Sequence, residues 1–447
     1  MFRKVLIANR GEIALRVART CRELDVRTVV CHSEADAASA AVRFADEAVC
    51  VGPAASRKSY LNAAAVLTAA LQTGAEAIHP GYGFLSEDPD FAEACADAGV
   101  VLIGPPPDVM ATLGNKASAR ALMARAGLPL LPGGVEPVDA AQAQELADGI
   151  GYPVIVKAVA GGGGRGMAVV HSRADFAAVY AGTRATAESL FGDGRVYVER
   201  YLRTARHVEV QVLCDTHGAA VHLGERDCSV QRRHQKLVEE TPAPNLPPGL
   251  AERMGEAAVR GALAAGYVGA GTWEFLVDEE GRFYFMEVNC RIQVEHPVTE
   301  AVTGLDLVRA QLEIAAGLPL DVARCGARRD GVAIECRINA EDPTRDFAPT
   351  PGVLSEFIPP GGPFVRVDTH AFTGAEVVPF YDSLLAKLVV WGPDREQAIA
   401  RMRRALGELH VKGVCTTASF LDGVLATPEF GAGRHHTSLV AELLGQA

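Results

Sequence analysis

The sequence predicts a mixed α/β and α+β protein that is divided into several domains. Over the first hundred residues, strand-like and helix-like segments alternate, which is the pattern of a parallel sheet covered by helices on both faces. After residue 206 the strands become longer and alternate polar with apolar residues, as strands of an antiparallel sheet do. The length of 447 residues exceeds that of one ordinary core and indicates roughly two to four domains or subdomains.

The first region is expected to contain the parallel sheet. Its first helix, over residues 12–24, is indicated by apolar residues at helical spacing, namely Ile13, Val17, Cys21 and Leu24. Further helices are predicted at residues 63–71 and 91–98, and strands at residues 4–8, 27–31, 75–78 and 100–103. A glycine and proline cluster at residues 104–107 then marks a domain edge.

The rest of the chain is predicted in three parts. A helix at residues 115–126 is ended by Gly127 and Pro129 and is followed by a small unit at 154–202, with strands at residues 154–158, 167–170 and 196–200. The antiparallel strands are expected at residues 207–214, 219–225, 271–277 and 282–288, with helices near residues 250–265 and 305–315. The tail, residues 331–447, predicts more strands and then helices at residues 395–408 and 416–425.

The composition excludes several classes of protein. Acidic residues outnumber basic ones, 55 to 43, and the net charge of −12 argues against general binding to nucleic acid or to an anionic membrane. The ten cysteines form no CxxC pair, which favours free thiols in a reducing compartment. The apolar run near the N-terminus is too short for a signal peptide, and no stretch reaches the length of a membrane span. A cytoplasmic protein is therefore expected.

A glycine-rich loop, Gly161 to Gly166, lies between two predicted strands. A row of glycines lets backbone N–H groups approach an anion closely, and Lys157 just before the loop could reach the same phosphates. The loop is not a Walker A motif, because no Lys-Ser/Thr follows it, and not a dinucleotide fingerprint, because a strand follows it. The alternative is a surface hairpin without a ligand.

Acidic and amide side chains alternate along the segment from Glu287 to Glu295. In an extended chain Glu287, Asn289, Arg291, Gln293 and Glu295 would share one face. Glu274 would lie beside Glu287 across a hairpin that turns at residues 278–281. Because the strands around them are apolar, these charges must be paired or must bind an ion, and two carboxylates with an amide oxygen suit Mg²⁺. Structural ion pairs in a core are the alternative.

A third stretch, residues 225–236, gathers Arg226, Arg232, Arg233, His234 and Lys236 in an otherwise acidic protein. It predicts a pocket for a small anion, and the alternative is a solvated basic loop.

Six stretches together are similar to biotin carboxylases of the ATP-grasp superfamily, in the family's order and over nearly the whole chain. They comprise residues 7–14, 79–87, 161–166, 232–236, 291–297 and 335–342. The resemblance implies an N-terminal Rossmann-like pre-ATP-grasp domain (residues 1–112), an ATP-grasp domain (113–330) with a mobile lid at about 130–202, and a C-terminal biotin carboxylase domain (331–447). Small departures from the family's pattern are Cys290, Arg200 and Ala160, and none puts the activity in doubt.

The resemblance also implies roles for individual residues. Those implied to hold ATP are Lys116 and Lys157 at the phosphates, Gly164, Arg165 and Gly166 in the lid, the hinge Glu199, Arg200, Tyr201 and Leu202, and His207, Gln231 and His234. Those implied to hold Mg²⁺, or Mn²⁺, are Glu274, Glu287 and Asn289. Those implied to hold bicarbonate are Lys236, Arg291, Gln293, Glu295 and the backbone of Val294, while Tyr82 and Arg337 would face biotin. The catalytic set would be Lys236, Arg291, Glu295 and Arg337.

The implied activity is the ATP-dependent carboxylation of carrier-bound biotin by bicarbonate, through carboxyphosphate. This is the first half-reaction of an acyl-CoA carboxylase, with acetyl-CoA as the expected acceptor and propionyl-CoA or pyruvate left open. The implied partners are a biotin carrier protein or domain, carboxyltransferase subunits and a second copy of the chain. Because no Met-Lys-Met triplet is present, we expect the chain to carry no biotin of its own. Two other classes remain open, another ATP-grasp ligase and a non-catalytic nucleotide-binding protein.

Overall fold

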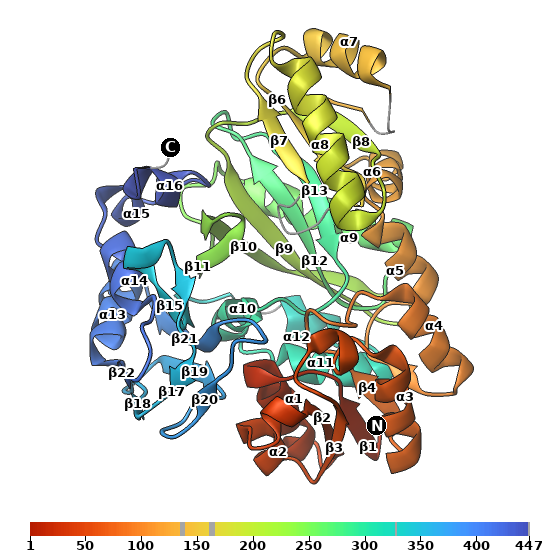
Figure 1. The fold of residues 1–447 in the computed structure, drawn as a ribbon, viewed down its shortest axis with the longest axis vertical. Helices are drawn as coiled ribbons and strands as arrows, with labels where there is room; N and C mark the ends of the chain where they lie inside the picture. Colours follow the sequence, from red (N-terminus) through yellow and green to blue (C-terminus); the bar gives the residue numbers. More distant parts are fainter. Residues whose placement is uncertain (135–138, 161–165, 327–328, 446–447) are drawn as a thin grey trace.

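The computed structural model describes residues 1–134, 139–160, 166–326 and 329–445. Figure 1 shows one long central sheet with the N-terminal region at one end, a small yellow unit at the other and the C-terminal helices along one side. Within the described residues, no helix is both long and apolar enough to cross a membrane.

The N-terminal region is a five-stranded parallel sheet in the order β3-β2-β1-β4-β5. Its strands are β1 (Lys4–Ile7), β2 (Arg27–Ser33), β3 (Glu47–Gly52), β4 (Ala77–His79) and β5 (Val101–Leu102). Its helices are α1 (Gly11–Glu23), α2 (Ala40–Phe44), α3 (Ala63–Thr73) and α4 (Pro89–Asp97), with short 3-10 turns at Glu34–Asp36 and Ser56–Lys58. Val5 and Ile7 pack on the side of α1, whereas Leu6 and Ala8 pack toward α3 and α4. Burial on both faces confirms the predicted covered parallel sheet.

The small unit, the lid, follows two connecting helices, α5 (Pro107–Gly114) and α6 (Lys116–Arg125). The lid contains α7 (Ala140–Ile150), β6 (Val154–Ala158), β7 (Met167–Val170), α8 (Phe176–Phe191) and β8 (Val196–Arg200), with strand order β7-β6-β8. Its buried residues form a hydrophobic core of their own under α7 and α8. The described part of the lid is therefore packed around a core separate from that of the central sheet. The predicted phosphate residues Gly164 and Arg165 lie outside the described residues.

The central sheet has eight antiparallel strands in the order β13-β12-β9-β10-β11-β14-β21-β19. Its strands are β9 (Arg206–Cys214), β10 (Ala220–Arg232), β11 (Gln235–Thr241), β12 (Gly269–Val277), β13 (Phe283–Asn289), β14 (Val332–Asn339), β19 (Val365–Thr369) and β21 (Leu384–Gly392). The helices that pack near it are α9 (Leu250–Ala265), α10 (His296–Thr303), α11 (Leu307–Ala315) and α12 (Val322–Gly326). Residues from the predicted second and third domains therefore share one sheet.

The C-terminal region packs four helices against the far end of this sheet, around a core that includes Ile334, Leu388 and Met402. These helices are α13 (Arg395–Glu408), α14 (Ala418–Leu425), α15 (Pro428–Gly431) and α16 (Leu439–Leu443). Three short strand pairs complete it: β15 (Glu341–Asp342) with β16 (Ala348–Pro349), β17 (Gly352–Val353) with β20 (Glu376–Val377), and β18 (Glu356–Ile358) with β22 (His410–Lys412). A 3-10 turn spans Pro343–Arg345.

One alternative left open by the sequence is excluded, and one local expectation is wrong. The basic stretch at 225–236 is not a loop, because it continues β10 to Arg232, turns at Arg233 and His234 with positive φ, and returns as β11. The acidic segment is extended only to Asn289. There the backbone N–H of Cys290 donates to the Glu87 carboxylate at 2.8 Å rather than to a neighbouring strand, and the chain leaves the sheet. Residues 291–295 therefore reach the site from a loop.

Candidate active site

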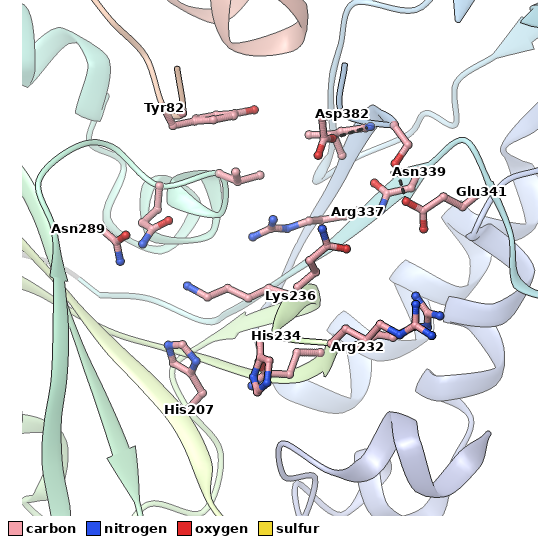
Figure 2. A pocket seen from close by; sticks show the side chains of 18 of the residues that line it. Tyr82, His207, Arg232, His234, Lys236, Asn289, Arg337, Asn339, Glu341 and Asp382 are labelled. Carbon is pink, nitrogen blue, oxygen red and sulfur yellow. Dashed lines mark hydrogen bonds between the residues drawn. The ribbon is translucent and has the colours of Figure 1, made fainter. Parts of the chain in front are cut away.

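A cleft of about 1410 Å³ lies where the lid, the central sheet, the N-terminal region and the C-terminal region meet. In Figure 2, Tyr82 lies on one side of it, His207 and His234 lie on the other, and Lys236 and Arg337 project between them. The predicted residues that line the cleft are Tyr82, Lys116, Lys157, Arg200, Tyr201, Leu202, His207, Gln231, His234, Lys236, Glu274, Glu287, Asn289, Arg291, Gln293, Val294 and Arg337. Glu199 and Glu295 are buried behind this lining.

The hairpin of β12 and β13 supplies the acidic end of the cleft. Glu274 and Glu287 are direct cross-strand partners, which confirms their predicted juxtaposition. Each carboxylate has a lysine partner, Lys116 Nζ at 3.0 Å from Glu287 and Lys236 Nζ at 2.9 Å from Glu274. The amide of Asn289 donates to Glu274 at 2.8 Å. All three side chains offer oxygen atoms, which are the ligands that Mg²⁺ prefers, so the set fits a magnesium ion.

The electrostatics of Glu274 keep it charged. Burial alone would raise its pKa, but Lys236 and His207 outweigh burial and hold the pKa well below the ordinary range. His207 Nε2 lies 3.3 Å from a Glu274 oxygen. Burial lowers the pKa of His207, and the carboxylate of Glu274 more than reverses this, so that the pKa is raised.

Lys236 is the central cation of the site. Its ammonium donates to Glu209 at 2.6 Å, Glu274 at 2.9 Å and Glu295 at 2.6 Å. Burial would lower the pKa of this lysine, yet the three carboxylates raise it well above its usual value. An ammonium with a raised pKa at this position could exchange one of these carboxylates for an anionic ligand.

Glu295 joins Lys236 to the opposite end of the cleft. It is fully buried and accepts from Lys236 on one oxygen and from Arg337 on the other, the latter at 2.9 Å. Burial favours a raised pKa, but the two cations hold the pKa of Glu295 well below its usual range. Arg337 also donates to Glu239 at 2.6 Å, so its guanidinium is fixed between two carboxylates.

Arg291 projects from the loop after β13. It donates to Asn289 at 2.9 Å, to Gln293 at 3.0 Å and to Glu87 of the N-terminal region at 2.9 Å. Gln293 in turn donates to Glu274 at 3.2 Å. The predicted anion-binding residues of this loop are therefore oriented toward the acidic hairpin by polar contacts.

The lid contributes Lys157 from β6, whose ammonium lies 2.7 Å from Glu199. Glu199 also pairs with Arg120 of α6, so its side chain serves an ion-pair cluster. At the predicted hinge, the backbone N–H groups of Arg200 and Tyr201 donate to the carbonyls of Pro132 and Pro153. These two backbone donors already have protein partners.

Several residues of this network were not predicted. Glu209 and Glu239 are fully buried and accept hydrogen bonds from Lys236 and Arg337, and Glu87 and Arg120 hold Arg291 and Glu199. A signal for Glu209 was available, because it follows His207 by two residues and lies between the apolar residues Val208 and Val210. Arg120 carried no such pattern, since its partner lies 79 residues away.

Three family models match the chain. These are the biotin carboxylase N-terminal domain over residues 1–110, the ATP-binding domain of the carbamoyl-phosphate synthase L chain over residues 115–323, and the biotin carboxylase C-terminal domain over residues 335–442.

Full-length relatives agree with these models. The chain is 52% identical to a biotin carboxylase of Nostoc sp. over 99% of both chains, and 49% identical to biotin carboxylase 1 of Bacillus subtilis over 98% of both. It is also 49% identical to one of the pyruvate carboxylase subunits of Methanothermobacter thermautotrophicus, over 99% of this chain and 90% of that protein.

Solved structures have the same fold. The biotin carboxylase–β,γ-ATP complex from Campylobacter jejuni superposes with a TM-score of 0.96 at 45% identity, covering 99% of both chains. The biotin carboxylase domain dimer of Hydrogenobacter thermophilus 2-oxoglutarate carboxylase, in complex with MgADP, ADP and bicarbonate, gives 0.95 at 45% identity, covering 100% of this chain and 98% of that one. From its three domain models, its relatives along the whole chain and its fold, this chain belongs to the biotin carboxylase family.

Proposed function

We propose that the cleft uses ATP and bicarbonate to carboxylate N1 of carrier-bound biotin, as the first half-reaction of an acyl-CoA carboxylase. The observation that supports this most directly is the continuous polar chain from Glu274 through Lys236 and Glu295 to Arg337. It joins a phosphate end to a biotin end within one cleft. A relative whose structure contains MgADP and bicarbonate has the same fold.

The nucleotide end is built to neutralise a polyphosphate. Lys116 and Lys157 line the cleft, and both have carboxylate partners that a phosphate could replace. Glu274, Glu287 and Asn289 would hold Mg²⁺ or Mn²⁺. When bound there, the ion neutralises phosphate charge and helps to hold the γ-phosphoryl group in line. The hinge, with His207, Gln231 and His234, would surround the rest of the nucleotide.

In the bicarbonate step, Glu295 would act as the general base. Arg291, Gln293 and the backbone of Val294 would hold bicarbonate while Glu295 takes its proton. A bicarbonate oxygen attacks the γ-phosphorus of ATP, the bond to the β–γ bridging oxygen breaks, and carboxyphosphate and ADP result. The lowered pKa of Glu295 favours its unprotonated form before bicarbonate binds. If Lys236 then pairs with the incoming anions instead of with Glu295, the basicity of Glu295 would increase.

The biotin step uses the opposite end of the cleft. Carboxyphosphate releases CO₂ and phosphate, and the phosphate takes the N1 proton of biotin. Arg337, held by Glu239 and Glu295, would stabilise the negative charge that develops on the ureido oxygen. Tyr82 would face the biotin ring, and N1 then attacks CO₂. Closure of the lid would exclude water, which would otherwise hydrolyse carboxyphosphate.

The acyl acceptor and the partners are further proposals, which rest on the activity proposed above. We propose acetyl-CoA as the acceptor, reached through a biotin carrier and a carboxyltransferase, and a homodimer as the working form. Some relatives are named for the carboxylation of pyruvate or of 2-oxoglutarate, so the acceptor should be tested directly. The biotinylated protein that co-purifies with this chain, tested with each acceptor, would identify it.

ADP release in the presence of ATP and Mg²⁺ tests the proposed activity. We expect ADP release to require bicarbonate and to be stimulated by free biotin. An ATP-grasp ligase of another kind would release ADP without bicarbonate when given an amine and a carboxylate. A non-catalytic nucleotide-binding protein would bind ATP and release no ADP under any of these conditions.

A further inference from the structure

Lys387 of β21 is a fully buried lysine that does not line the cleft. Its ammonium donates to the carbonyl oxygen of Val294 at 2.9 Å and lies 3.0 Å from Glu12 of α1. Asp368 is more distant, at 4.0 Å, and is bonded to Arg366. A buried ammonium is costly unless it has such partners, so these contacts determine where Lys387 sits.

The Val294 contact holds the backbone of a segment that is otherwise anchored through its side chains. Between the end of β13 and the start of α10 the chain belongs to no sheet, and Val294 lies in the turn just before the helix. Glu87 fixes the start of this segment through the N–H of Cys290, and Lys387 fixes its end through the carbonyl of Val294. The loop proposed to hold bicarbonate is therefore anchored at both ends by side chains from other parts of the fold.

The contact with Glu12 connects Lys387 to the proposed biotin site. Glu12 is buried, and the same oxygen that faces Lys387 accepts a hydrogen bond from the hydroxyl of Tyr82. Tyr82 lines the biotin end of the cleft. One carboxylate thus joins Lys387 to the residue proposed to face biotin.

We propose that Lys387 is a positioning residue that couples the bicarbonate loop to the biotin-facing Tyr82. The coupling rests on the roles proposed above for Val294 and Tyr82. Because one ammonium holds both the Val294 carbonyl and Glu12, displacement of the loop changes the anchor of Tyr82, and the reverse also holds. Occupation of either substrate site should then favour the geometry of the other, as linkage requires.

The test uses the double variant Lys387→Met with Glu12→Gln. Replacing the lysine alone would leave Glu12 as an uncompensated buried anion, whereas the double variant removes both charges and keeps similar volumes. We expect the KM for bicarbonate and the KM for biotin each to rise by about tenfold, a change of about 1.4 kcal/mol for each substrate. The KM for ATP should stay within about twofold. The stimulation of bicarbonate-dependent ADP release by biotin should be lost.

A matched control is Leu388→Ala, at the next position of the same strand. Leu388 faces the opposite side of the sheet and packs in the C-terminal core. The Leu388→Ala variant should have a lower melting temperature, and biotin should still stimulate its bicarbonate-dependent ADP release. The conservative variant Lys387→Arg keeps a cation near Glu12. It should therefore retain part of the stimulation that the double variant loses.

The outcomes separate this inference from the proposed activity. If the wild type shows no bicarbonate-dependent ADP release, the proposed activity fails. If the wild type is active and the folded double variant, confirmed by normal nucleotide binding, keeps the wild-type stimulation by biotin, the coupling is wrong. Equal loss of stimulation in Leu388→Ala would also overturn it, because loss of stability alone would then explain the effect. Failure of the double variant to bind nucleotide would contradict it as well, since Lys387 would then support the whole fold.

Discussion

Glu295 is the residue on which the proposed chemistry depends most. Replacing it by glutamine keeps its shape but removes the base, so we expect bicarbonate-dependent ADP release to fall by about 10²–10⁴-fold. Nucleotide affinity should change by less than about threefold, because Glu295 lies behind the lining and its hydrogen bonds with described side chains are to Lys236, Arg337 and Cys228. ADP release with and without bicarbonate, and nucleotide titration, measure the two effects.

The control for Glu295 is Glu240→Gln. Glu240 is equally buried in the same sheet but pairs with Arg395 of α13, away from the cleft. The Glu240→Gln variant should be less stable, and its ADP release should depend on bicarbonate as in the wild type. If the Glu295 variant lost ATP affinity while its residual rate still required bicarbonate, the role of base would be wrong.

A substitution of Glu287 tests the proposed metal site. Glu287→Gln removes one anionic oxygen ligand and releases Lys116, so we expect activity to fall by at least about tenfold and the Mg²⁺ concentration for half-maximal activity to rise. Glu280→Gln, in the exposed turn of the same hairpin, is the matched control. Near-normal turnover of the Glu287 variant at low Mg²⁺ would show that Glu287 is only a structural ion-pair partner.

A pair of acidic residues predicts how stability depends on pH. Glu239 and Glu335 are fully buried cross-strand partners, and neither oxygen of Glu335 has a hydrogen-bond partner among the described residues. Burial raises the pKa of Glu239 to about 7 against the effect of Arg337, and it raises the pKa of Glu335 well above its ordinary value. A raised carboxyl pKa stabilises the fold fully below the unfolded value of about 4.3, and this stability is lost as pH rises through the folded value.

We therefore expect the free energy of unfolding to decrease as the pH rises from about 4.3 toward the folded pKa values, by up to about 1.4 kcal/mol per pH unit for each group that keeps its proton only in the folded state. In Glu335→Gln, which keeps a neutral side chain at that position, the decrease should be shallower. Urea denaturation at several pH values measures both slopes. Parallel slopes for the two proteins would mean that Glu335 does not hold a proton in the folded state.

Sequence reasoning found single residues well when their type was unusual for their surroundings. Glu274, Glu287 and Lys236 stand out because charged groups in apolar strands need partners. It did not find Lys387 or Glu239, because each lies in a strand that pairs with distant parts of the chain. Their importance comes from contacts that only the folded sheet creates.

At the scale of elements, the glycine loop gives a test of the lid. Gly166 has φ +73°, and a Cβ there would lie 2.9 Å from Phe191 Cε2 and 3.0 Å from Ala158 Cβ. We expect Gly166→Ala to destabilise the lid and to raise the KM for ATP by several-fold, since both the backbone conformation and the close contact oppose a side chain. Gly182→Ala is the control, because Gly182 lies in α8 with no atom within 4 Å of its Cβ position. Unchanged ATP kinetics in both variants would favour a hairpin without a role in ATP use.

Most elements were predicted because their periodicity is local. The helices α9 and α13 begin and end where their patterns indicate, and the strands of the lid agree closely. The turn at Arg233 and His234 was missed, because two consecutive non-glycine residues with positive φ leave no composition signal. The end of β13 was also missed, since it depends on Glu87, about 200 residues earlier in the chain.

At the scale of the whole molecule, the proposed reaction needs a partner. We predict that the purified chain carries no biotin and turns over free biotin slowly, because a tethered substrate gains effective concentration and orientation. Adding a biotinylated carrier domain should raise the carboxylation rate by at least about tenfold. Intact mass and carboxylation rates check the two parts. A biotinyl mass increment would refute the first part, and a rate that ignores the carrier would refute the second.

The order of the strands in the central sheet could not be predicted, because pairing between distant strands leaves no local pattern. That order has a consequence for how the molecule unfolds. Since β11 pairs with β14 over four residues, from Val238 with Cys336 to Thr241 with Ala333, the regions matched by separate family models share backbone hydrogen bonds. Excising the C-terminal region would expose two unpaired strand edges, which are prone to aggregate. In hydrogen–deuterium exchange, the amides on both sides of this junction should exchange together, and only through global unfolding.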